Sequence, residues 1–138
     1  ISKIIPCETQ YSNIKNINIK NLRDNAIEAA EQSERLDIPT IERICNLNEL
    51  IANWPKDRKL IFCDESIKEN QFIIETLLSV RNIENKFAIL VGPEGGFSDE
   101  ERNLIKSEKN VISVSLGETI LRSDTAITVA LYCLRELT

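Results

Sequence analysis

Histidine and methionine are both absent from this sequence of 138 residues. Without histidine, the chain lacks the commonest general base and the commonest metal ligand of proteins. Its chemistry therefore depends on carboxylates, arginine, lysine, tyrosine, hydroxyls, thiols or the backbone. Because translation starts with methionine, we expect residue 1 not to be the natural start, and the chain to be a fragment or a processed product.

Long apolar runs and closely spaced cysteines are also absent. No run approaches the roughly 18 residues of a membrane-spanning helix, and the start of the chain lacks the pattern of a signal peptide. The cysteines form no C-x-x-C pair, which disfavours a zinc site. We expect a cytoplasmic protein that binds no metal and whose thiols are buried and reduced. These thiols belong to Cys7, Cys45, Cys63 and Cys133.

The remaining composition is typical of one globular domain, since 42% of the residues are hydrophobic and 28% are charged. The formal net charge is -5. Because neutralising phosphates requires lysine and arginine, this charge argues against the chain binding nucleic acid by itself.

Short apolar runs alternate with helical patterns along the chain. We predict strands at 3–6, 41–45, 59–63, 87–91 and 111–115, and helices at 21–32, 47–53, 66–80, 98–109 and 123–137. Capping boxes are predicted at two helix starts, one formed by Ser66 with Glu69 and one by Ser98 with Glu101. Continuous apolar strands that alternate with helices are typical of an α/β fold, with a parallel sheet covered on both faces.

Two loops follow predicted strands, at the sheet edge where α/β proteins bind ligands. The first, 92–98, is rich in glycine, which lets a ligand approach the backbone closely. It matches neither the Walker nor the G-x-G-x-x-G pattern, and a glycine-rich turn alone favours a tight turn without a ligand. The second, 116–126, places Arg122 at a helix start, where its charge opposes the helix dipole. The residues leave open whether Arg122 has a functional role or pairs with Asp124 or Glu118.

Together the two loops resemble the RsmE family of 16S ribosomal RNA uridine N3-methyltransferases, in the SPOUT superfamily. The matching motifs are Gly92-Pro93-Glu94-Gly95-Gly96-Phe97-Ser98-x-x-Glu101 and Leu116-Gly117-x-x-Ile120-Leu121-Arg122-x-x-Thr125-Ala126. An earlier stretch at 28–35, followed by Ile38-Pro39, is similar to the family as well. The resemblance covers nearly the whole chain.

The resemblance implies a fold, a cofactor and partners. The fold is an α/β knot, in which the carboxy-terminal chain threads a loop, and the protein is a homodimer. The substrate is a uridine in 16S ribosomal RNA of the small subunit. The cofactor is S-adenosylmethionine (AdoMet), bound by the two loops. The expected cofactor-binding residues are Gly92, Pro93, Glu94, Gly95, Gly96, Leu116, Gly117, Ile120, Leu121, Thr125 and Ala126.

The sequence departs from the family pattern at its start. From the resemblance we expect residues 1–138 to be the catalytic domain without its first strand and helix, and the amino-terminal PUA-like RNA-binding domain of the family not to be among them. An RNA-binding surface outside the chain would account for its acidic charge. Asp124 stands where the family usually has glutamate, which keeps the charge.

Candidate catalytic residues follow from the same motifs. Arg122 is the best candidate for stabilising negative charge on the uracil oxygens, although it can instead bind a phosphate. Glu94 is a candidate for shaping the cofactor loop or for proton transfer, and a carboxylate turned to solvent is the alternative. Glu65 is a weaker pocket candidate, and a solvated turn is the favoured alternative for it. Two other functions remain open: a non-catalytic knotted module that dimerises or binds cofactor, and a SPOUT methyltransferase acting on another RNA.

Overall fold

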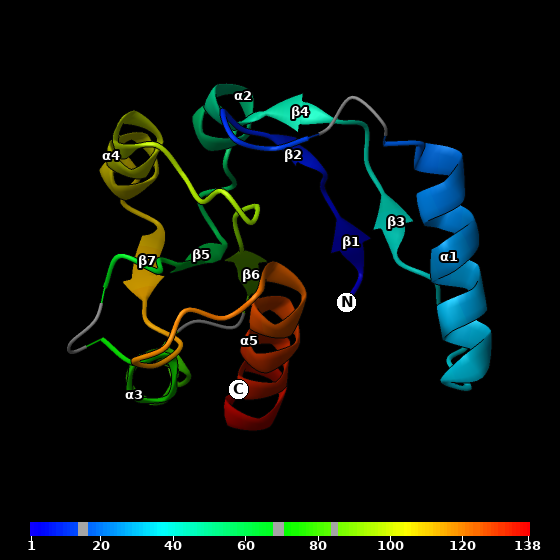
Figure 1. The fold of residues 1–138 in the computed structure, drawn as a ribbon. Coiled ribbons are helices and arrows are strands. Elements are labelled where there is room, and N and C mark those ends of the chain that lie inside the picture. Colours follow the sequence, from blue (N-terminus) through cyan, green and yellow to red (C-terminus); the bar gives the residue numbers. More distant parts are fainter. Residues whose placement is uncertain (14–16, 68–70, 84–85) are drawn as a thin grey trace.

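A computed structural model describes residues 1–13, 17–67, 71–83 and 86–138, and it confirms the α/β fold with parallel sheets (Figure 1). The central sheet has three parallel strands in the order β6-β5-β7. They are β5 (Lys59–Cys63), β6 (Phe87–Leu90) and β7 (Val111–Val114). Each lies within one residue of its predicted bounds.

Helices cover both faces of this sheet, as the apolar pattern predicts (Figure 1). The side chains of β5 alternate between the faces, so Leu60 and Phe62 pack on one side and Ile61 on the other. Helices α2 and α4 contribute to the first side, and α3 and α5 to the second. The helices are α1 (Ile19–Gln32), α2 (Leu47–Ala52), α3 (Ile73–Val80), α4 (Asp99–Ser107) and α5 (Ser123–Leu137).

Four two-residue strands form two further parallel pairs near the amino terminus. β1 (Lys3–Ile4) pairs with β3 (Thr40–Ile41), and β2 (Cys7–Glu8) pairs with β4 (Cys45–Asn46). The single strand predicted at 41–45 is therefore wrong. Pro6 lies between β1 and β2 and has no N–H to donate, so it interrupts the ladder there. Helix α1 packs on β3, to one side of the central sheet (Figure 1).

The two predicted capping boxes have different outcomes. At α4 the box is confirmed: the Ser98 amide donates to Glu101 Oε1 at 2.9 Å, and the Glu101 amide donates to Ser98 Oγ at 3.1 Å. At α3 the predicted start is wrong, because the helix begins at Ile73, whose amide donates to the Ser115 carbonyl beyond β7. Ser66 instead donates to Asp64, and its predicted partner Glu69 lies outside the described residues.

All four cysteines are free and half-buried. Burial is the largest cause that raises the pKa of Cys7 and of Cys63 to about 12, so both thiols are neutral at physiological pH. None of the helices among the described residues has the length and apolar character needed to cross a bilayer.

Candidate functional site

A hollow opens at the carboxyl ends of the three central strands, where the sequence places both loops. Its wall comes from segments after β5, β6 and β7, closed by the start of α5 and by a side chain of α4. Counting the part open to solvent, it spans about 790 Å³. The lining residues are Cys63, Asp64, Glu65, Ile67, Val91, Gly92, Pro93, Glu94, Gly96, Phe97, Arg102, Ser115, Leu116, Gly117, Glu118, Thr119, Ile120, Leu121, Ser123 and Ala126.

Most of the residues predicted to bind cofactor line this hollow. They are Gly92, Pro93, Glu94, Gly96, Leu116, Gly117, Ile120, Leu121 and Ala126. Gly95, Thr125 and the catalytic candidate Arg122 are not among the lining residues. The weaker candidate Glu65 does line it, together with two charged residues that the motifs do not single out, Asp64 and Arg102.

The glycines of the two loops are needed for different reasons. Gly96 and Gly117 have φ angles of +73° and +132°, which side chains rarely adopt. A Cβ on Gly96 would collide with Glu65 Oε1, whereas one on Gly117 would meet nothing within 4 Å and would face open space. A Cβ on Gly95 would lie 2.9 Å from the Cβ of Tyr11. Gly95 therefore allows the segment after β2 to pack on the loop.

The second loop is tied to the first at the start of α5. The Ser123 hydroxyl donates to the Gly92 carbonyl at 2.9 Å, and the Ser123 amide donates to Glu94 Oε1 at 3.2 Å. Glu94 thus has a structural partner, which supports its expected role in shaping the cofactor loop. It caps one of the free amides at the amino terminus of α5.

Arg122 lies on the surface beside the hollow. Its side chain is 80% exposed, and its Nε lies 3.6 Å from Asp124 Oδ1. Of the two partners that the sequence offers for Arg122, Asp124 and Glu118, the ion pair with Asp124 is therefore present. An exposed pair of this kind contributes little stability, so it leaves the guanidinium available to a substrate.

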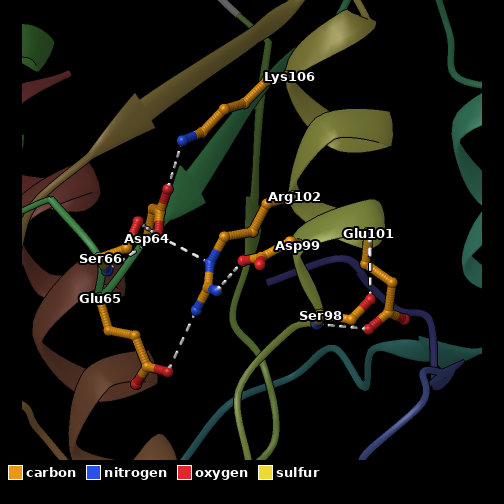
Figure 2. Close-up of polar contacts among 8 residues, drawn as sticks. All are labelled: Asp64, Glu65, Ser66, Ser98, Asp99, Glu101, Arg102 and Lys106. Atoms are coloured by element: carbon orange, nitrogen blue, oxygen red, sulfur yellow. Dashed lines mark hydrogen bonds and ion pairs between the residues drawn. The ribbon is translucent and has the colours of Figure 1, made fainter.

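A polar cluster lies at the end of β5 (Figure 2), and three of its members, Asp64, Glu65 and Arg102, line the hollow. The Asp64 side chain is fully buried and accepts hydrogen bonds from the Ser66 amide and hydroxyl at 2.9 and 2.6 Å. From α4, Lys106 Nζ lies 2.9 Å from Asp64 Oδ2, and Arg102 Nε lies 3.4 Å from Asp64 Oδ1. Arg102 also pairs with Glu65 and with Asp99, each at 3.6 Å.

The charge of Asp64 is stabilised in this cluster. Burial favours a raised pKa for its carboxyl, but the hydrogen bonds from Ser66 and Lys106 outweigh burial and lower the pKa below its usual range. A sequence signal for the cluster exists in hindsight. Arg102 and Lys106 are four residues apart on α4, so they share one face of the helix, and the acidic pair Asp64-Glu65 directly follows β5.

Among the described residues, no group of three or more histidine, cysteine, aspartate or glutamate side chains is arranged to hold a metal ion. The hollow instead combines carboxylates, one guanidinium, glycine backbone and aliphatic side chains. Such a lining suits an organic ligand with both apolar and polar parts.

Comparisons with known proteins identify relatives of the chain. The chain is 38% identical over 137 residues to ribosomal RNA small subunit methyltransferase E of Rickettsia conorii, covering 99% of this chain and 54% of that protein. The protein of the same name from Synechocystis is 34% identical over 80% of this chain and 36% of its own length. The chain thus spans about half the length, or less, of these curated relatives.

Solved structures share the fold. A methyltransferase from Legionella pneumophila, in complex with its bound cofactor SAM, superposes with a TM-score of 0.79 at 27% identity, over 99% of this chain and 55% of that one. A ribosomal RNA small subunit methyltransferase E from Neisseria gonorrhoeae, bound to S-adenosylmethionine, gives 0.77 at 24% identity, over 99% and 55%. The RNA methyltransferase domain family matches residues 1–135. With nearly the whole chain matched, this protein belongs to the family of RNA methyltransferase domains.

Proposed function

We propose that the chain is the catalytic domain of an enzyme that transfers a methyl group from AdoMet to N3 of a uridine in 16S ribosomal RNA. The observation that carries the proposal is the hollow between the two motif loops, in a chain of the RNA methyltransferase domain family. The name of the Rickettsia relative supports ribosomal RNA of the small subunit as the substrate. The SAM-bound Legionella structure supports AdoMet as the cofactor. The chain spans about half the length of each of these two proteins.

The lining residues fit AdoMet. The ligand has an adenine ring with apolar faces, ribose hydroxyls and a sulfonium cation, and the hollow offers a matching surface for these parts. Leu116 and Leu121 provide apolar surface, the open backbone at Gly117 allows close approach, and Glu65 and Glu118 supply negative charge. When bound, the cofactor supplies an already activated methyl group.

The residues of the chain position the cofactor and the uracil, and they stabilise the charge that develops during methyl transfer. The two loops orient the ligands, so that proximity lowers the barrier. Arg122, exposed beside the hollow, stabilises the negative charge that develops on the uracil oxygens. Since the chain has no histidine, the N3 proton leaves to a carboxylate or to solvent, and Glu94 is the candidate on the first loop.

The family resemblance extends the proposal to assembly and topology. We infer a cytoplasmic homodimer whose carboxy-terminal segment threads a loop to form the knot. The bonds from Ser123 to the first loop support this path, since they hold the segment after β7 against the loop after β6. Light scattering of the chain at micromolar concentration should give twice 15.7 kDa, and a monomer would contradict the dimer.

The residues 1–138 account for catalysis, and we propose that a PUA-like domain outside them binds the RNA. The acidic net charge of -5 supports this division, because phosphate contacts need an excess of cations. The length of the relatives supports it as well.

Mass spectrometry of ribosomal RNA tests the function. Cells lacking the full-length gene should lose one N3-methyluridine from 16S RNA, and the wild-type gene should restore it. If the modified nucleotides of 16S RNA are unchanged and another RNA loses a methyl group, the substrate is that other RNA. A complete set of methyl groups in all RNA would instead favour the non-catalytic module.

A further inference from the structure

Arg102 is the only cationic side chain among the described residues that line the hollow. Its charge is matched by three carboxylates, which lie 3.4 to 3.6 Å from its guanidinium nitrogens (Figure 2). These ion pairs leave little positive potential to attract an anionic ligand or a phosphate. A role in holding neighbouring groups fits Arg102 better than a role in binding anions.

At its inner end, the guanidinium pairs with Asp64, whose Oδ1 lies 3.4 Å from Arg102 Nε. Asp64 is fully buried and is held by two hydrogen bonds from Ser66, so its position is set by the end of β5. Arg102 itself is 20% exposed and extends from α4 across this carboxylate. The pair therefore links the helix that follows the first loop to the strand at the centre of the sheet.

At its outer end, the guanidinium reaches Glu65. The Glu65 carboxylate is 41% exposed, and its Oε1 occupies the space next to Gly96 that a side chain would fill. Both residues line the hollow, so an acceptor oxygen lies in the wall beside the tight turn of the first loop. An unrestrained glutamate at this exposure would sample several rotamers, and ordering it on binding would cost affinity.

We propose that Arg102 is a positioning residue, which holds the Glu65 carboxylate against the Gly96 turn so that Glu65 accepts hydrogen bonds from N–H or O–H groups of the cofactor. This inference rests on the proposed binding of AdoMet. Asp64 anchors Arg102, and Arg102 orders Glu65. The ligand then meets a preorganised acceptor and does not have to order a mobile side chain.

A double-mutant cycle tests whether Arg102 acts through Glu65. Calorimetry measures the affinity of the chain for AdoMet and for its demethylated product in wild type, Arg102→Met, Glu65→Gln and the double variant. Each single change should weaken binding about tenfold, the size of one charged hydrogen bond. The double variant should be no weaker than Glu65→Gln alone. Additive losses, or wild-type affinity in Arg102→Met, would overturn the proposal.

Lys106→Met is the matched control. Lys106 contacts Asp64 from the next turn of α4, at 2.9 Å, but it does not line the hollow. The Lys106→Met variant should bind the cofactor with an affinity within twofold of wild type, and its free energy of unfolding should be lower. If Lys106→Met weakens binding as much as Arg102→Met, the loss of affinity comes from disturbing Asp64 and not from freeing Glu65.

Arg102→Lys replaces Arg102→Met if the latter does not fold. One ammonium cannot span both carboxylates, so Arg102→Lys should also weaken cofactor binding.

A second readout needs no ligand. The chain has four glycines, at 92, 95, 96 and 117, so a sample labelled with ¹⁵N-glycine reports only on the two loops. Arg102→Met and Glu65→Gln should both shift the Gly96 amide signal, and Lys106→Met should leave it in place. An unmoved Gly96 signal in Arg102→Met would refute the positioning role. Wild-type protein that binds no AdoMet would refute the proposed function instead.

Methylthioadenosine identifies the donor groups on the ligand. It carries the ribose hydroxyls of the product but no ammonium. A loss of affinity in Glu65→Gln for both compounds places Glu65 at the adenosine part, at its ribose hydroxyls or its adenine amine, and a loss for the product alone places it at the ammonium. No loss for either compound would exclude Glu65 as a ligand contact.

Discussion

Single residues at the site separate into those that shape the hollow and those that face a substrate. Gly92, Gly96 and Ser123 belong to the first kind, because Gly92 and Ser123 have contacts within the loops and Gly96 packs against Glu65. Arg122 belongs to the second, because its exposed guanidinium lies outside the lining and has one weak ion pair. The two kinds should respond differently to mutation.

Arg122→Ala should slow methyl transfer by the full-length protein about 10²–10³-fold, the usual cost of losing a donor that stabilises developing charge. Its affinity for AdoMet should stay within a few fold, since Arg122 does not line the hollow. Transfer of labelled methyl groups and calorimetry measure the two quantities. Equal losses in both would identify Arg122 as a cofactor-binding or structural residue.

Asp64 makes the stability of the chain sensitive to acid. The folded state holds its pKa below the ordinary value of about 3.9, so the ionised carboxylate stabilises the fold above that pH. This contribution disappears as the pH falls through the lowered pKa. In urea denaturation, Asp64→Asn should be less stable by about 1–3 kcal/mol at pH 7 and should lose less stability between pH 5 and 2. Parallel pH profiles of the two proteins would contradict this assignment.

At the scale of elements, α4 connects the first loop to the rest of the protein. Its capping residue Glu101 also accepts a hydrogen bond from the Gln10 amide at 3.1 Å, which joins the segment after β2 to the helix start. The same helix carries Arg102 and Lys106 toward Asp64. A change at the amino terminus of α4 should therefore affect both the amino-terminal segment and the hollow.

Ser98→Ala removes the first half of the capping box. The expected loss is about 0.5–2 kcal/mol in the free energy of unfolding, because the Glu101 amide loses its acceptor. Ser107→Ala, at the other end of α4, is the control and should change stability by less than about 0.5 kcal/mol. Urea midpoints of the three proteins check the prediction. An equal loss of unfolding free energy in both variants would show that the capping hydrogen bond does not stabilise α4 more than an ordinary surface contact.

Regular elements are the part of the fold that the sequence predicts best. The strand at 59–63 and the helix at 123–137 have the predicted bounds, because continuous apolar runs and a 3.6-residue period depend on local sequence. The start of α3 fails, since residues 71–73 are held by hydrogen bonds to Ser115, which is distant in sequence. The motifs find most of the hollow, but they miss Arg102, whose role depends on which strand α4 packs beside.

The whole molecule combines a hollow suited to a small cofactor with a net charge unsuited to RNA. We therefore predict that residues 1–138 alone methylate small-subunit particles at under a tenth of the rate of the full-length protein, while binding AdoMet equally well. Methyl transfer to undermodified particles measures the difference. Equal rates would show that a local basic patch on this domain is enough to bind the RNA.

We propose that the two loops bind AdoMet, and the four glycines offer the most direct measurement of this binding. All of them lie in these loops, so ¹⁵N-glycine spectra of the chain contain one amide signal for each and none from elsewhere. Titration with AdoMet should shift the signals of Gly96 and Gly117, which line the hollow from opposite loops, with a single saturating affinity. If all four signals remain in place at millimolar AdoMet, the loops do not form the cofactor site and the proposed function is wrong.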